Sequence, residues 1–145
     1  MLIPENVIYQ VLVDDPNVVF LIGGTSNPRI YPQSAPQNTN YPYMVYHRID
    51  AQRPHHMGGP SGIVMSRIQI DFYDNNYDGV MQLAEYARMA LNGYRGLLTI
   101  NGETADIRDV NQSNDYGDIV EPQGAQSLGI FRTVHDYVVT MYEAA

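Results

Sequence analysis

The sequence predicts an α+β fold, a single domain over residues 1–145 with a largely antiparallel β-sheet, helices packed on one face of it and long loops between strands. The length of 145 residues is that of one ordinary domain. Several segments alternate apolar and polar residues, as strands do, and they stand beside segments with helical spacing. Hairpin signals and long connections separate them and no βαβ unit repeats, which favours antiparallel pairing.

Residues 1–24 are predicted to form a helical segment. Pro4 suits the first turn of a helix, and apolar residues then recur at the spacing of one helix face. Asp15 precedes a proline and belongs to the residue types that cap helices, so a second short helix is expected to begin there. The glycines at positions 23 and 24 are expected to end it.

β-Forming residues gather in several later stretches. The clearest strand is "VMSRIQIDFYD", because Ile68, Ile70 and Phe72 share one side and polar residues share the other. Asn101 and Gly102 indicate a tight hairpin turn, since both positions of that turn take positive φ. The expected strands cover residues 29–31, 43–50, 64–74, the two arms of the 97–110 hairpin, and 128–143.

A third helix is expected between a capping signal at residues 75–76 and the Asn-Gly pair at 92–93. Its apolar stripe consists of Val80, Leu83, Ala84, Ala87 and Leu91. Met81 and Met89 lie among the polar residues outside this stripe. Two methionines there suggest that a partner covers this side, although isolated apolar residues also occur on ordinary protein surfaces.

Two long loops are predicted, at residues 51–62 and 111–127. The first, "AQRPHHMGGPSG", is rich in glycine and proline, and the second is polar. Loops of this length within a compact domain are usually functional or disordered. We expect the 51–62 loop to order against a neighbouring subunit or another protein, and a plain solvated hairpin tip is the alternative.

Composition narrows the function classes. Sixteen acidic and eight basic residues give a net charge of −8, and every basic residue is arginine. A protein that binds the nucleic-acid backbone needs a basic face, so this class is disfavoured. The absence of cysteine rules out disulfides and thiolate metal sites, and the absence of lysine rules out a Gly-Lys phosphate loop. The longest apolar run, "VVFLI", is too short for a membrane span, and the N-terminus shows no signal-peptide pattern.

No catalytic, cofactor-binding or metal-binding site is predicted. His55 and His56 are adjacent, so their side chains diverge in extended backbone, and further ligands would have to come from His47 or His135. One strand end and the following helix start carry acids that suit turns and first turns, namely Asp71, Asp74 and Asp78. A hydrolase built on dispersed carboxylates stays open, because its geometry is hidden in a sequence.

The remaining features suit protein–protein contact. Twelve tyrosines and seven methionines occur in a chain without tryptophan; tyrosine offers a large contact area, and methionine adapts to irregular surfaces. Filling of the core is the ordinary alternative for most of them. A monomeric peptide-binding module that uses a tyrosine-rich strand face is a further alternative. The candidate interface residues are Arg53, His55, His56, Met57, Met81, Met89, Tyr116 and Ile119.

Five stretches within residues 29–142 resemble one known family in their order and spacing. They read "RIYPQSAP", "YPYMVYHRI", "GPSGIVMSRIQIDFYD", "AEYARMALNGYRG" and "IFRTVHDYVVTMYE". The chain thereby resembles the tail completion proteins, also called tail terminator or head–tail joining proteins, of long-tailed bacteriophages and phage-like particles. No single stretch is diagnostic, so the co-occurrence of all five carries the resemblance.

The resemblance implies a structural virion protein that is not an enzyme. Members of such a family fold as small α+β units and assemble as rings, commonly hexamers, at the head-proximal end of the tail tube. The ring ends tube polymerisation and joins the tail to the head connector, while DNA passes through the lumen. The acidic composition agrees, since it leaves DNA free to slide without specific binding.

The partners implied are further copies of the chain, the tail tube protein and the head connector or stopper protein, with no cofactor and no membrane. The place implied is the neck of a virion that is assembled in the cytoplasm of a bacterial host. A head-side neck or connector-stopper protein is the alternative position within the same particle.

Overall fold

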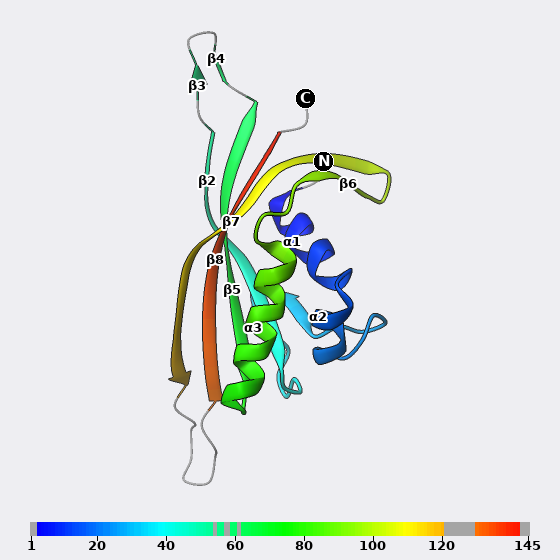
Figure 1. Cartoon of the computed structure of the whole chain (residues 1–145), viewed down its shortest axis with the longest axis vertical. Coiled ribbons are helices and arrows are strands. Elements are labelled where there is room, and N and C mark those ends of the chain that lie inside the picture. Colours follow the sequence, from blue (N-terminus) through cyan, green and yellow to red (C-terminus); the bar gives the residue numbers. More distant parts are fainter. Residues whose placement is uncertain (1–2, 54, 57–58, 61, 121–129, 143–145) are drawn as a thin grey trace.

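A computed structural model gives the fold and describes residues 3–53, 55–56, 59–60, 62–120 and 130–142 (Figure 1). The helices are α1 (Pro4–Val13), α2 (Pro16–Leu21) and α3 (Tyr77–Leu91). The strands are β1 (Ile30–Pro32), β2 (Tyr43–Gln52), β3 (His55–His56), β4 (Gly59–Pro60), β5 (Ile63–Asp74), β6 (Gly96–Ile100), β7 (Glu103–Val120) and β8 (Ile130–Tyr142). The chain is therefore one sheet-rich domain with a few helices.

The main sheet is mixed and curled. Its strand order is β1-β2-β5-β8-β7-β6, and only β1 and β2 run parallel among these neighbours. In Figure 1 the β6–β7 hairpin bends away from the long axis of the sheet toward the side of α1. The predicted antiparallel pairing thus holds for most of the sheet, and the short β1 makes one edge parallel.

The helices contact one another and the central strands. α3 contacts β5, β7 and β8, while α1 contacts α2, α3, β2 and β5. Figure 1 shows the three helices grouped together beside the sheet. The packing of every helix on one face of the sheet stays a prediction. Among the described residues, no helix is long and apolar enough to cross a membrane.

The two N-terminal helices, α1 and α2, begin at the residues that the capping and proline signals predicted. Asp15 caps α2, because its Oδ1 accepts hydrogen bonds from the backbone N–H groups of Asn17 at 2.9 Å and Val18 at 3.2 Å. Gly24 then donates its N–H to the carbonyl of Val19 at 2.7 Å, with a φ of 89° that favours glycine. The helical segment predicted for residues 1–24 is thus present within the described residues.

The core lies between the helices and one side of the sheet. The even-numbered residues of β5 from Val64 to Asp74 are all buried, whereas Arg67 on the other side is exposed. The α3 stripe predicted from the sequence is also buried, and its members are Val80, Leu83, Ala84, Ala87 and Leu91. α1 adds Val7, Ile8, Val11 and Leu12 to the same cluster. Hydrophobic periodicity therefore identified the core face of these elements.

α3 and the β6–β7 hairpin also form as predicted. Asn76 caps α3 by accepting a hydrogen bond from the N–H of Gly79 at 3.2 Å. Asn101 and Gly102 have φ values of 51° and 82°, as the predicted tight turn requires. These short-range signals succeed because each needs only a few neighbouring residues.

The prediction of a long loop at 111–127 is wrong as far as Val120. β7 continues through this stretch and pairs with β8 from Ile107 to Val120. The polar side chains of 111–118 hid the strand, but the strongly β-forming sequence of β8 supplies a pairing partner along its whole length. Residues 121–127 lie outside the described part of the chain.

The prediction of a loop at 51–62 is also corrected. β2 extends to Gln52, and β3 pairs with β4 in a small two-stranded sheet that continues the β2–β5 hairpin. Figure 1 shows this hairpin reaching beyond one end of the main sheet. The described residues of this segment (53, 55–56, 59–60 and 62) thus contain paired strands, and we call them the β3–β4 arm.

Two strands contain irregular pairing. In β2 the register against β5 shifts between Arg48 and Asp50, so Ile49 is an extra residue. In β7 the register against β8 shifts between Ile107 and Asp109 and again between Gln112 and Asn114. Such bulges raise the local twist of a strand and interrupt its hydrogen-bond pattern.

Candidate subunit interface

The eight candidate interface residues fall in three separate places. Arg53, His55 and His56 belong to the β3–β4 arm, and the side chains of these two histidines are outside the described part of the structure, as is all of Met57. Met81 and Met89 lie on α3, and Tyr116 lies on β7. Ile119 is also in β7, although its side chain is not described. The described side chains of the set therefore do not form one patch, and whether the eight residues make a common interface stays a prediction.

The α3 methionines are exposed, as the sequence predicted. Met81 is 41% exposed and Met89 is 65% exposed. Met81 also contacts the sheet, because Oγ1 of Thr133 on β8 donates a hydrogen bond to its Sδ at 3.7 Å. The polar side of α3 thus carries two adaptable apolar side chains beside the β7–β8 edge of the sheet.

A pocket of about 370 Å³ lies between α3 and the paired strands β7 and β8, and we call it the α3–β7 pocket. Its lining includes Tyr77, Met81, Asp115, Gly117, Phe131 and Thr133. The rings of Tyr77 and Phe131 meet edge to face, with centroids 5.6 Å apart. A Cβ at Gly117 would lie 3.2 Å from the carbonyl oxygen of Arg132, so a larger residue there would crowd the paired strand β8. A mainly apolar side chain from a partner fits such a surface.

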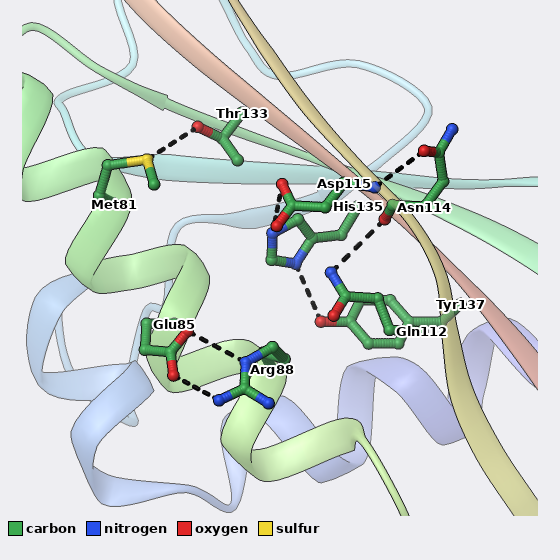
Figure 2. A network of polar contacts seen from close by, with 9 residues as sticks. All are labelled: Met81, Glu85, Arg88, Gln112, Asn114, Asp115, Thr133, His135 and Tyr137. Carbon is green, nitrogen blue, oxygen red and sulfur yellow. Dashed lines mark hydrogen bonds and ion pairs between the residues drawn. The ribbon is translucent and has the colours of Figure 1, made fainter.

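A buried histidine lies beside this pocket (Figure 2). Nε2 of His135 lies 3.4 Å from Oδ1 of Asp115, and Nδ1 of His135 lies 2.9 Å from the hydroxyl oxygen of Tyr137. When Nε2 carries the proton toward Asp115, the Tyr137 hydroxyl donates to Nδ1. Burial lowers the pKa of His135, and the Asp115 carboxylate offsets part of that shift. The His135 imidazole is therefore neutral, and its two nitrogens face Asp115 on β7 and Tyr137 on β8.

We expect the His135 site to make stability depend on pH. The unfolded chain takes up a proton at His135 near pH 6.5, whereas the folded chain takes it up only at lower pH. The free energy of unfolding should therefore fall as the pH drops from about 7 to about 5, and His135→Gln should reduce this slope. Denaturant unfolding across this range measures it, with both proteins compared at about pH 8 as the baseline. Equal slopes would contradict the assignment.

The other side of β5 carries a polar network, and we call this side the Asp71 face. Arg132 Nη2 donates to Oδ2 of buried Asp71 at 3.2 Å, and Gln69 Nε2 donates to its Oδ1 at 2.9 Å. Tyr73 adds a hydrogen bond from its hydroxyl at 3.3 Å, and burial together with the Asp71 charge raises the pKa of Tyr73 to about 12. Its ring stacks on Tyr43 at 4.9 Å.

Four of the acids and histidines considered as ligands or acid–base groups have described side chains that do not converge, namely Asp71, Asp74, His47 and His135. Asp71 is held by Arg132, whereas Asp74 lies on the opposite side of β5 and accepts a hydrogen bond from the N–H of Asn75 at 2.8 Å. His47 pairs with Gln69 on the Asp71 face, and His135 lies on the other face. Within the described ranges, no group of three metal-ligating side chains could hold an ion.

Sequence reasoning missed the contacts that define this region. His135 and Tyr137 lie on one face of β8 by simple alternation, but Asp115 lay in the predicted 111–127 loop and therefore had no predicted position. The Asp71–Arg132 pair joins β5 and β8, which are 61 residues apart at this point. The two residues are diagonal neighbours, since Asp71 faces Val134 and Arg132 faces Tyr73. Opposite charges on the same face of two alternating strands were the available signal.

Comparisons with known proteins agree with this fold. Residues 6–116 match the family described as "Tail completion protein gp17". No curated protein sequence matches the chain. A chain in the solved structure described as "Virion of native gene transfer agent (GTA) particle" has a TM-score of 0.70 at 14% identity, covering 93% of this chain and 91% of that one. The structural likeness shows a shared fold, and the match over most of the length shows that this chain belongs to the tail completion protein gp17 family.

Proposed function

We propose that the chain forms a ring at the head-proximal end of a phage tail tube, where it ends tube polymerisation and joins the tail to the head connector. Membership of the tail completion family gives the chain a structural role in a phage tail, and it is the observation on which the proposal depends. The ring is proposed to be a hexamer in the virion neck, assembled in the cytoplasm of a bacterial host.

The shape of the subunit supports contacts at both ends of such a ring. The β3–β4 arm extends beyond one end of the sheet, while β7 and β8 reach the opposite end (Figure 1). The α3–β7 pocket lies toward that opposite end, because Gly117 of β7 and Phe131 of β8 line it, and exposed Met89 lies farther along α3. A subunit of a cyclic ring needs unlike patches for its two neighbours, and further patches for the tube and the connector.

The net charge of −8 fits the proposed passage of DNA through the lumen. Phosphates bind strongly where lysine and arginine neutralise them, so an acidic subunit gives DNA little to bind. The DNA would therefore move through the ring without specific contacts.

Removal of the gene from its parent phage or particle genome tests the proposed position. Loss of a terminator should leave tails of uncontrolled length or tails that do not join heads, and electron microscopy of lysates measures both. Loss of a head-side stopper should instead give normal tails beside heads that leak DNA. Normal, joined particles without the protein would contradict both positions.

We further expect Met81→Glu with Met89→Glu to reduce the yield of joined particles by about tenfold or more, because charges on an apolar contact surface oppose its burial. Complementation of the deletion by plasmid-borne protein measures the yield. Phe20→Glu is the matched control, since Phe20 is 80% exposed on α2. Equal yields from the double variant and the control would show that the α3 methionines are not a required contact.

A further inference from the structure

We propose that Asn101, at the tip of the β6–β7 hairpin, is a site of spontaneous chemical modification, where the side-chain amide is lost and aspartate or isoaspartate forms. The chain contains two Asn-Gly pairs, Asn92-Gly93 and Asn101-Gly102. Asparagine is among the heat-sensitive residue types, and a following glycine leaves its own backbone nitrogen accessible because it has no Cβ. This modification needs only one folded subunit and does not depend on the proposed ring.

The reaction is an attack within the chain, which proximity favours. Hydroxide or water removes the proton from the N–H of Gly102, and this nitrogen forms a bond to Cγ of Asn101 while the side-chain nitrogen leaves as ammonia. Water then opens the cyclic imide. Opening at Cγ gives aspartate, and opening at the backbone carbonyl gives isoaspartate, whose main chain runs through Cγ. Either product carries a carboxylate that is ionised at neutral pH, so the net charge of −8 becomes more negative by one unit.

The reacting groups at the hairpin tip are accessible and unrestrained. Asn101 and Gly102 are exposed and form the turn between β6 and β7, with φ values of 51° and 82°. Among the described residues, neither the Asn101 side chain nor the N–H of Gly102 has a hydrogen-bond partner. A Cβ placed on Gly102 would meet nothing within 4 Å, so solvent reaches its nitrogen. Both residues lie beyond the last pair of the strand ladder, Ile100 with Glu103.

The second Asn-Gly pair is also exposed, but hydrogen bonds hold both of its reacting groups. Oδ1 of Asn92 accepts from the N–H of Gln112 at 3.1 Å, and the N–H of Gly93 donates to the carbonyl of Val110 at 2.7 Å. The Gly93 nitrogen is the atom that would attack, and the Asn92 amide contains the carbon that would be attacked. Because both bonds join the end of α3 to β7, reaction at Asn92 requires this contact to open first.

The two products differ in their effect on the hairpin. Aspartate before glycine suits the same tight turn as asparagine, so this product adds a charge and leaves the strands in place. Isoaspartate adds an atom to the main chain, so the two-residue turn loses its geometry next to the Ile100–Glu103 pair. The hairpin tip is therefore a position where surface charge and local backbone structure change with time, without any enzyme.

Peptide mass spectrometry of the folded, full-length protein compares the two sites in one digest. Trypsin cleaves after arginine, so Asn92 lies in the peptide 89–95 and Asn101 in the peptide 96–108. After incubation at mildly alkaline pH, we expect Asn101 to be modified about tenfold or more faster than Asn92, because two hydrogen bonds must open at Asn92. The modified 96–108 peptide should separate into aspartate and isoaspartate forms on chromatography. A sample that is digested without incubation gives the background.

The chain unfolded in guanidinium chloride is the matched control. Unfolding removes the hydrogen bonds at both sites and keeps the glycine after each asparagine, so the two rates should become similar. Asn101→Asp is a second control, because aspartate fits the same turn and the variant should fold. On anion exchange, the incubated original protein should shift toward the position of this variant.

The possible outcomes decide the matter without reference to assembly. Similar rates at the two sites of the folded protein, or a faster rate at Asn92, would overturn the assignment of Asn101. An unmodified Asn101 in the folded protein, with both sites modified in the unfolded chain, would show that the turn itself protects the residue and would also overturn it. Because a single subunit is measured, each of these results leaves the proposed function unchanged.

Discussion

Replacement of Phe72 by alanine should lower the free energy of unfolding by about 3–5 kcal/mol. Phe72 is completely buried in β5, and its ring meets the ring of His135 edge to face with centroids 5.0 Å apart. Truncation removes the buried ring and leaves a cavity that the surrounding strands and α3 can fill only in part. Urea unfolding followed by circular dichroism measures the change.

The matched control for this prediction is Phe20→Ala. The Phe20 side chain is 80% exposed on α2, so the same truncation removes little buried area. Its unfolding free energy should stay within about 0.5 kcal/mol of the original protein. If the two variants lose similar stability, Phe72 does not occupy the core position described for β5.

The second large effect is expected at the Asp71–Arg132 pair. Arg132→Met should cost about 2–4 kcal/mol, because it leaves the buried Asp71 carboxylate without its cationic partner. The cost is below that of a fully buried pair, since the Arg132 side chain is 25% exposed. Gln69 and Tyr73 still donate to the carboxylate and soften the loss further. The same urea titration measures it.

Two further variants decide whether the pair itself is responsible. Asp71→Asn combined with Arg132→Met should be more stable than Arg132→Met alone, because no unpaired charge stays buried. Arg88→Met is the control, since its ion pair with Glu85 is exposed and its loss should change the unfolding free energy much less than Arg132→Met does. A double variant no more stable than Arg132→Met would show that lost packing, and not the charge, causes the effect.

Capping residues and turn residues correctly predicted where helices begin and where the β6–β7 hairpin turns. Asp15, Asn76 and the Asn101-Gly102 turn act through hydrogen bonds or φ values within a few residues, and each lies where it was expected. The apolar stripe of α3 follows helical periodicity and is buried. The core side of β5 was equally readable, because alternation by itself places residues on two faces.

The parts that sequence reasoning missed depend on distant strands. The segment from Asn111 to Val120 has few β-forming residues, and only its pairing with β8 makes it a strand. Asp115 lies near His135 only because the register of β7 against β8 places them opposite each other. No motif within residues 111–127 predicts this register. The candidate interface residues show the same limit. Periodicity predicts which side chains are exposed, but strand order and register decide which exposed side chains are neighbours.

The bulge at Ile49 in β2 and the bulge between Gln112 and Asn114 in β7 have a consequence for free copies of the protein in solution. Unpaired edge strands can pair with edge strands of other molecules and so start aggregation. A bulge raises the twist of an edge strand, and a flat strand from another molecule pairs poorly with it. Under the proposed function, we therefore expect free copies to stay dispersed until the end of a tail tube holds the first of them in the right orientation. The start of assembly would then depend on the presence of a tube end and only weakly on the concentration of the free protein.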